Sequence, residues 1–519
     1  MTERPPTRSG RPPDAAGRRR GAESPVAPPR GLATFGLRVA EALAGAGIGM
    51  PPALDGKPGG SGGGGLAGIS TDSRTVREGE IFVALSGPSF DGSDFVGAAF
   101  AGGAAAAVAP ESFRPREAGL PAEFRGRTAL VADTLAALGS LARFVRGRSG
   151  AYLAAVTGSV GKTTVKDMLK EVFLEGFGPT LATEGNFNNR VGVPWTLFRL
   201  EKDHRAAVLE LGAGDFGEMA ALAGMALPDL ALVTRVERAH LETFGDVAGV
   251  ARAKFELFAN LPPSATAVVS LDDPLVRAMG ETLAGDPAFG GRIFTCGREG
   301  SGADAELAGL SELPGGGWRL TVRGGVFGDG FGMETPVPGA HNAWNAFLAA
   351  AAGAAAGLSP GAIAAGLARA SLPRGRGRML RSGGLGILDS SYNASPGAVA
   401  AELERLSGLP GPRGALLSDM LEMGETGPAL HREVGRRAAA AGLDYLALAG
   451  DLSRETLRGA LDAGFPRSRA RHFGNPMEAA EWARAMAGGM GTLLVKGSHA
   501  TGLWKAVGLL APEAEDPGS

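Results

Sequence analysis

The sequence predicts an α/β protein built from three domains. The chain has 519 residues, whereas a compact domain usually holds about 100 to 200. Short apolar segments that resemble strands alternate with helical segments over most of the chain, a pattern typical of parallel sheets covered by helices. A glycine-rich turn at 157–164 joins one such strand to the next helix. The middle domain is therefore expected to hold phosphate groups at that turn.

Composition and charge exclude several broad classes of protein. The formal net charge is -2 and the pI is near 6.4, so no overall basic field attracts nucleic acid or an anionic membrane. The single cysteine, Cys296, excludes a disulfide between two residues of the chain. No uncharged apolar run reaches the roughly 18 residues of a membrane span, and no apolar segment follows the Arg18–Arg20 triplet. We therefore expect a cytoplasmic monomer without nucleic-acid partners or membrane insertion.

The first part of the chain divides into a tail and a small domain. Residues 1–30 are rich in Pro, Arg, Gly and Ser, and this composition predicts a disordered basic tail. The first domain is expected at 31–148. A helical pattern starts at Leu32, a glycine-rich loop covers 59–65, and the segment 81–85 is typical of a strand.

Two further domains follow, at 149–372 and 373–519. The second begins with a parallel-sheet pattern, with strands expected at 153–156, 206–211, 230–234 and 265–271, and ends in an alanine-rich helical pair at 341–369. A linker at 373–377 precedes the third domain, whose strands are expected at 385–388, 414–417, 445–449 and 492–495. The third domain is therefore predicted to be of the α/β class.

The turn after the strand 153–156 carries the clearest chemistry. Its residues are Thr157, Gly158, Ser159, Val160, Gly161, Lys162, Thr163 and Thr164. Backbone N–H groups at a helix N-terminus cradle phosphates, Lys162 neutralises their oxygens, and Thr163 offers a hydroxyl to Mg2+. The alternative is an ordinary glycine-rich turn with a solvated lysine. Glu210 ends the next strand and His240 follows the one after, so both are expected beside this loop.

An ordered series of motifs resembles the Mur ligase family. After the loop comes Gly-Asn-Phe-Asn-Asn-Arg-Val-Gly-Val-Pro at 185–194, which includes Asn188 and Asn189. Further motifs surround Glu210, His240, Lys254, and the pair Asn342 and Asn345, and others lie at 389–396, 420–424 and 496–498. The resemblance covers nearly all of the chain after residue 65. It implies a small UDP-binding α/β domain, a central P-loop ATPase domain and a C-terminal Rossmann-like domain.

Within the family, the segments at 390–396, 420–424 and 496–498 are similar to the enzymes that add D-alanyl-D-alanine to UDP-N-acetylmuramoyl-tripeptide. The Asp-Asn-Pro-Arg motif of relatives that add diaminopimelate or lysine is absent from the sequence. The resemblance thus implies an ATP-dependent ligase of peptidoglycan precursor synthesis that proceeds through an acyl phosphate. Its substrates would be D-alanyl-D-alanine and UDP-N-acetylmuramoyl-tripeptide, and its cofactors would be ATP and Mg2+.

The resemblance also implies roles for individual residues. Lys162, His240, Lys254 and Lys496 would be catalytic, with Thr163, Glu210, His240 and a carbamate on Lys254 as Mg2+ ligands. Asn342 and Asn345 would contact adenine, and Arg378 and Asp389 would clamp ATP across domains, although an ordinary ion pair between domains is the alternative. Substrate contacts would come from Ser73, Arg74, Asp91, Gly92, Asn188, Asn189, Asn393 and His499. Without the family resemblance, the alternative interpretation of Lys254 is a solvated lysine on the surface of a helix.

Two segments depart from the family pattern. Thr-Arg-Val-Glu-Arg at 234–238 stands where relatives have Asn and Gly, and His499 stands where they have arginine after Lys-Gly-Ser. Other readings also remain open: a different Mur-type ligase, a ligase that adds glutamate to a folate, or a P-loop nucleotide kinase or regulatory NTPase. The acceptor's third residue, diaminopimelate or lysine, is likewise left open.

Overall fold

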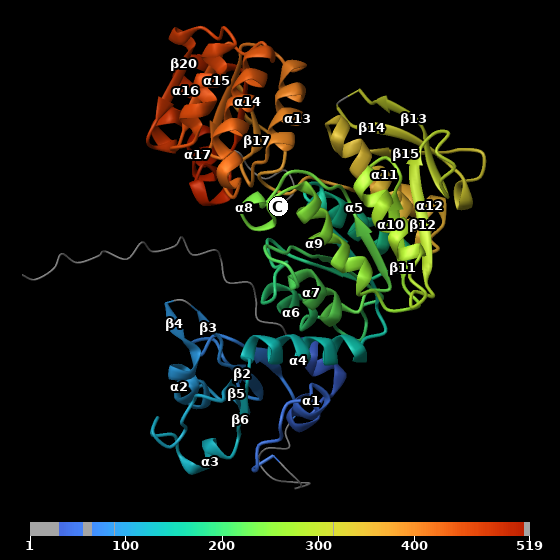
Figure 1. Cartoon of the computed structure of the whole chain (residues 1–519), viewed down its shortest axis with the longest axis vertical. Helices are drawn as coiled ribbons and strands as arrows, with labels where there is room; N and C mark the ends of the chain where they lie inside the picture. The colour runs from blue at the N-terminus through green and yellow to red at the C-terminus, as the bar shows by residue number, and fades with distance from the viewer. Residues whose placement is uncertain (1–30, 55–64, 88, 315, 513–519) are drawn as a thin grey trace, which may run out of the picture.

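The computed structural model describes residues 31–54, 65–87, 89–314 and 316–512, and the predicted tail at 1–30 lies outside them. Three separate main sheets follow one another along the long axis of the molecule (Figure 1), together with a two-stranded hairpin in the N-terminal part. In the described part of the chain, no helix combines the length and the apolar composition that crossing a membrane requires.

The N-terminal sheet is parallel and has the order β1-β2-β5-β6. Its strands are β1 (Gly68–Ser70), β2 (Glu80–Val83), β5 (Ala106–Pro110) and β6 (Thr128–Val131), with the hairpin β3 (Ser86–Gly87) and β4 (Phe90–Asp91). The helices are η1 (Gly31–Phe35), α1 (Val39–Gly45), η2 (Gly92–Phe95), α2 (Val96–Ala101), α3 (Ala122–Arg125) and α4 (Thr134–Arg148). The continuous helix expected from Leu32 is wrong, because Gly36 takes a φ of 63° and Arg38 pairs with Gly65 in a bridge.

The central sheet is larger than the sequence suggests. Its order is β15-β14-β13-β12-β11-β10-β7-β9-β8, parallel except for the antiparallel strands β14 and β15. The strands are β7 (Tyr152–Thr157), β8 (Thr180–Ala182), β9 (Ala206–Glu210), β10 (Leu230–Val233), β11 (Thr266–Ser270), β12 (Arg292–Arg298), β13 (Ala305–Glu312), β14 (Trp318–Arg323) and β15 (Phe331–Thr335). The last four strands were not expected from the sequence.

The helices of the central part cover this sheet. They are α5 (Lys162–Gly176), α6 (Gly192–Leu197), α7 (Glu218–Ala226), α8 (Leu241–Phe244), α9 (Val247–Ala259), α10 (Pro274–Ala284), η3 (Gly325–Phe327), α11 (Ala340–Ala355) and α12 (Pro360–Ala368). The expected alanine-rich pair is α11 and α12, which pack on α5. Small side chains allow this close approach: a Cβ on Gly366 would collide with the backbone of Val172 in α5.

The C-terminal sheet has the order β16-β17-β21-β18-β19-β20 and is parallel except for the hairpin β16–β17. The strands are β16 (Arg378–Ser382), β17 (Gly384–Ser390), β18 (Arg413–Ser418), β19 (Tyr445–Ala449), β20 (Ala470–Phe473) and β21 (Met490–Lys496). The helices are α13 (Pro396–Ser407), η4 (Gly424–Thr426), α14 (Gly427–Ala440), α15 (Ser453–Asp462), η5 (Arg467–Arg469), α16 (Pro476–Ala487), η6 (His499–Thr501) and α17 (Trp504–Leu510).

The segments expected to carry function follow the carboxyl ends of strands. The phosphate loop follows β7, Glu210 ends β9, and Lys496 ends β21. In open parallel sheets this edge is where ligands bind. The C-terminal part approaches the same edge of the central sheet, since α8 contacts η4 (Figure 1).

Candidate active site

The phosphate loop between β7 and α5 is shaped by two glycines. Gly158 has a φ of 144° and Gly161 a φ of 83°, both in the region that side chains rarely adopt. A Cβ on Gly158 would collide with Oγ1 of Thr234, and one on Gly161 would lie 2.6 Å from Oδ1 of Asn345. Lys162, the first residue of α5, turns back so that its Nζ donates to the carbonyl of Gly158 at 2.8 Å. The ammonium therefore lies over the loop, at the N-terminus of the helix.

The segment that departs from the family pattern supports this loop. Thr234 Oγ1 donates to the carbonyl of Val160 at 2.6 Å, and the N–H of Ser159 donates to the carbonyl of Arg235 at 2.7 Å. The backbone N–H and carbonyl of Glu237 each bond Ser159 Oγ at 3.0 Å. The Arg235 and Glu237 side chains pair with each other at 3.2 Å. Because their contacts to the loop use backbone atoms, their side chains can differ without loss of this support.

Thr163 and Glu210 meet directly. Thr163 Oγ1 donates to Oε2 of Glu210 at 2.6 Å, and Asn188 Nδ2 donates to Oε1 of the same carboxylate at 2.8 Å. Burial by itself raises the pKa of Glu210, but the charges of Lys162 and Arg376 and these two hydrogen bonds outweigh it and leave the pKa below its ordinary value. The carboxylate is thus held ionised in a buried position.

A divalent cation fits this donor set. A hydroxyl and an ionised carboxylate, both buried and already in contact, are the hard oxygen donors that Mg2+ prefers. A buried, isolated carboxylate carries a large desolvation penalty, and a nearby cation would offset that penalty. Thr163 and Glu210 would hold the ion.

Lys254 and His240 both lie near the Phe244 ring. Nζ of Lys254 is 6.0 Å from the ring centroid, and the His240 ring is 6.2 Å from it. Lys254 is on α9 and only 2 % exposed. Burial lowers the pKa of Lys254 to about 7, and the positive charge of Lys162 contributes to this shift. The structure contradicts the alternative of a solvated surface lysine, because this amine is buried.

His240 also contacts the C-terminal part of the chain. Its Nδ1 lies 2.5 Å from Oε2 of Glu422, in the loop after β18. The hydrogen bond from His240 holds the pKa of Glu422 below its ordinary value, although burial opposes this. Sequence reasoning quoted the segment around Glu422 but gave that residue no role.

The loop before β16 and the ends of β17 and β21 form the C-terminal side of the site. Asp389 accepts hydrogen bonds from the N–H of Gly375 at 3.0 Å and from the N–H of Ser391 at 3.1 Å. Lys496 Nζ donates to the carbonyl of Asn393 at 3.0 Å. Burial lowers the pKa of Lys496 to about 8, against the opposing charge of Glu402. Arg378 lies opposite Asp389 in the β16–β17 register.

Arg376 is a residue that sequence reasoning missed, because it lies in a segment read as a linker. Its guanidinium lies 4.0 Å from the ring centroid of Tyr392. Its charge acts on Lys162 and Glu210 of the central part and on Lys496 of the C-terminal part. The charge of Arg376 therefore reaches both the phosphate loop and Lys496.

His499 stands in an aromatic stack. Its ring is 5.5 Å from that of Tyr392 and 5.8 Å from that of Trp504, nearly parallel to the latter at 14°. Trp504 is 42 % exposed. The stack extends the row that begins at Arg376 and leads from the site toward the surface.

The remaining predicted residues lie around this centre or in the N-terminal part. Asn345 Nδ2 donates to Oδ1 of Asn342 at 3.1 Å, both side chains are buried, and Asn345 lies next to Gly161. Asn189 Oδ1 accepts from the N–H groups of Val191 and Gly192 at the start of α6. These three asparagines therefore have structural contacts of their own.

The segments expected to hold the nucleotide precursor follow β1 and β2 in the N-terminal sheet. Asp72 and the exposed side chain of Arg74 form an ion pair at 2.6 Å, next to Ser73. Asp91 accepts from Ser86 Oγ at 2.9 Å and from the N–H of Ser93 at 2.9 Å. Gly92 is buried against the backbone of Leu85, where a Cβ would collide. No described contact joins these segments to the phosphate loop.

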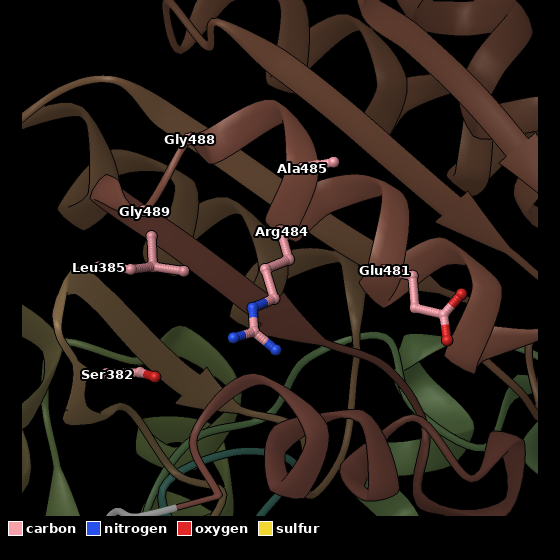
Figure 2. Close-up of a pocket in the computed structure, with 7 residues that line it drawn as sticks. All are labelled: Ser382, Leu385, Glu481, Arg484, Ala485, Gly488 and Gly489. Carbon is pink, nitrogen blue, oxygen red and sulfur yellow. The ribbon is translucent and has the colours of Figure 1, made fainter.

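A surface hollow lies elsewhere in the C-terminal part and includes none of the predicted site residues. Figure 2 shows Arg484 and Glu481 on α16, with Leu385 and Ser382 across from them. The two charged side chains come from the same helix, and the hollow is open to solvent. This hollow is therefore not a second candidate for the active site, which we place at the phosphate loop.

Comparison with known proteins agrees with this arrangement. The model described as Mur ligase middle domain matches residues 156–353, the one described as Mur ligase, glutamate ligase domain matches 375–499, and the one described as Mur ligase family, catalytic domain matches 66–146. A UDP-N-acetylmuramoyl-tripeptide--D-alanyl-D-alanine ligase from Escherichia coli (strain K12) is 36 % identical over 75 % of this chain and 82 % of its own.

Solved structures agree as well. A crystal structure of MurF from Acinetobacter baumannii has a TM-score of 0.76 and 30 % identity, over 87 % of this chain and 94 % of that one. The MurF ligase from Thermotoga maritima in complex with ADP has a TM-score of 0.72 and 26 % identity, over 86 % and 97 %. The chain therefore belongs to the Mur ligase family of ATP-dependent ligases.

Proposed function

We propose that this chain joins D-alanyl-D-alanine to UDP-N-acetylmuramoyl-tripeptide, with ATP as the energy source, in the cytoplasmic synthesis of peptidoglycan precursors. The names of the relatives from Escherichia coli and Synechocystis support this assignment, since both are ligases of this kind. The observation that carries it is that Lys162 at the phosphate loop and Lys496 on β21, from two parts of the chain, both lie within reach of the charge of Arg376. Such an arrangement suits transfer of a phosphoryl group between two bound substrates.

The reaction has two steps. An oxygen of the tripeptide carboxylate attacks the γ-phosphorus of ATP, and the bond to the ADP oxygen breaks, giving an acyl phosphate. The amine of D-alanyl-D-alanine then attacks the acyl carbon, loses a proton, and expels phosphate as the amide bond forms. Activation is required because joining an amine to a carboxylate in water is unfavourable. Positioning and charge neutralisation supply most of the catalysis in such transfers.

The chain's own residues would act as follows. Lys162 and the loop amides hold the β- and γ-phosphates, and Lys496 and Arg376 neutralise charge on the transferring group from the opposite side. Thr163 and Glu210 would hold one Mg2+, and His240 and a carbamate on Lys254 a second. Bound Mg2+ supplies charge neutralisation for the phosphate oxygens and the substrate carboxylate. Asn188 keeps Glu210 oriented through its hydrogen bond.

The other parts would bind the substrates' remaining groups. Ser73, Arg74, Asp91 and Gly92 of the 31–148 domain would hold the UDP end. Asn342 and Asn345 would lie near adenine, with Arg378 and Asp389 at the junction of the 149–372 and 373–519 domains. Asn189, Asn393 and His499 would contact the peptide substrates, and we expect a monomer.

The test is a phosphate-release assay with purified full-length protein, ATP and Mg2+. We expect negligible hydrolysis with ATP alone, because the carboxylate that accepts the γ-phosphoryl group is then absent and the site must exclude water as a substitute. Peptide product should require both the UDP-muramoyl tripeptide and D-alanyl-D-alanine. Separate reactions with the diaminopimelate and lysine forms of the acceptor would identify the third residue. Rapid hydrolysis with ATP and Mg2+ alone would instead support a nucleotide kinase or regulatory NTPase.

A further inference from the structure

Two residues in unusual backbone conformations meet across the central and C-terminal parts. Only three non-glycine residues of the described chain have a positive φ: Leu227, His240 and Glu422. His240 has a φ of 51° and Glu422 a φ of 64°. Such conformations are costly for residues with a Cβ and tend to persist at functional sites. That two of the three contact each other calls for a common explanation.

Their contact joins side chain and backbone. Glu422 Oε2 lies 2.5 Å from His240 Nδ1, and the carbonyl of Glu422 accepts a bond from the N–H of Glu242 at 3.4 Å. Gly424, with a φ of 54°, lies so close to Glu242 that a Cβ would be 3.2 Å from its Cα. The loop after β18 is therefore seated on the start of α8.

The same loop is bonded to the C-terminal active-site segment. The N–H of Leu421 donates to Ser498 Oγ at 3.0 Å, and the N–H of Ser498 donates to the carbonyl of Asp419 at 3.1 Å. Ser498 is two residues from Lys496. The carboxylate of Glu422 and the ammonium of Lys496 thus belong to one hydrogen-bonded unit, so movement of the C-terminal part would carry both together.

The geometry at His240 has a chemical consequence. A carboxylate at Nδ1 fixes the proton on that nitrogen and leaves Nε2 as the unprotonated atom that can bind a metal. In metal sites this partner also fixes the plane of the ring. Neither side chain is buried, with exposed fractions of 37 % for His240 and 60 % for Glu422. A contact so open to water adds little stability of its own, so orientation is its more substantial effect.

We propose that Glu422 is a positioning residue that orients His240 for metal binding and makes completion of the metal site depend on closure of the C-terminal part. This inference rests on the proposed function, in which His240 is a ligand for the second Mg2+. It extends that function by assigning a residue of the C-terminal part to a metal site otherwise formed by the central part.

The test uses the full chain with ADP and Mn2+ as the probe, with free Mn2+ followed by electron paramagnetic resonance. Glu422→Gly is the central variant, because glycine accepts a φ of 64° without strain and removes the side chain that carries the carboxylate. We expect it to weaken the second Mn2+ site about 10-fold or more, with ADP affinity and melting temperature retained. Glu422→Gln should have a smaller effect, because an amide oxygen can still accept from Nδ1. Glu425→Gln, an exposed acid on the same loop, is the matched control and should match wild type.

A nitrogen-15 histidine spectrum gives a readout independent of turnover: the His240 signals should show a proton fixed on Nδ1 in wild type and exchange between both nitrogens in Glu422→Gly. If Glu422→Gly binds Mn2+ as wild type does while His240→Ala does not, the positioning role is wrong and the proposed ligand role stands. If His240→Ala also binds normally, the ligand role itself fails. If the conformation of Glu422 only serves the turn, Glu422→Gly will be neutral or stabilising in every assay.

Discussion

Replacement of Lys254 tests the chemistry of the site most directly. The pKa of this amine is lowered to about 7 by burial. At pH 7.5 about three quarters of such amines are neutral, compared with about 0.1 % for a lysine of pKa about 10.5. Only the neutral amine attacks CO2, forming a nitrogen–carbon bond and releasing a proton. Burial therefore makes Lys254 several hundredfold more available for carbamate formation than a solvated lysine.

The variants follow from this chemistry. Lys254→Arg cannot form a carbamate, and Lys254→Ala lacks the nitrogen, so both should lower turnover by about 100-fold or more, with ATP affinity largely kept. Acetate should partly restore Lys254→Ala by supplying a carboxylate in the vacated space. Lys170→Ala is the control, because Lys170 is a half-exposed lysine paired with Glu171 on α5.

The carbamate itself can be observed with carbon-13 bicarbonate by nuclear magnetic resonance. We expect a signal in wild type and in Lys170→Ala that is absent from both Lys254 variants. Because the folded-state pKa is lowered to about 7, acidification below that value protonates the amine, and both the signal and turnover should decline as pH falls from 8 to 6. Full activity of Lys254→Arg, or no carbamate signal at pH 8, would refute the reasoning.

Two further predictions concern specificity and stability. His499→Arg should change the apparent KM for D-alanyl-D-alanine and leave the apparent KM for ATP within about twofold. The reason is that the planar guanidinium of arginine binds carboxylates, and His499 lies in the C-terminal aromatic stack. A change confined to the KM for ATP would contradict this prediction. Gly435→Ala should destabilise the protein by about 1 to 3 kcal/mol in urea unfolding, because its Cβ would collide with the carbonyl of Thr456 where α14 packs on α15. Gly508→Ala in α17, where a Cβ meets nothing within 4 Å, is its control and should be neutral or stabilising.

Local signals in the sequence determined much of this fold. The buried parallel strands β7, β9, β10 and β11 are short apolar runs between helical segments, and each lies within two residues of its expected position. The phosphate loop was recognisable because its glycines, lysine and threonine are contiguous. The contact between Thr163 and Glu210 follows from the same logic, since parallel neighbouring strands end at one edge of a sheet.

Tertiary structure alone decided the rest. Strands β12 to β15 are half-exposed and partly antiparallel, so they lack the continuous apolar run of the other central strands and become strands by pairing with one another at the edge of the central sheet. Arg376 lies in a segment expected to be a linker, and Glu422 lies in a family motif that assigned it no role. Their positions beside Lys162 and His240 arise only when the C-terminal part packs on the central sheet, because electrostatic and hydrogen-bond partners are set by distance in space and not by separation along the chain.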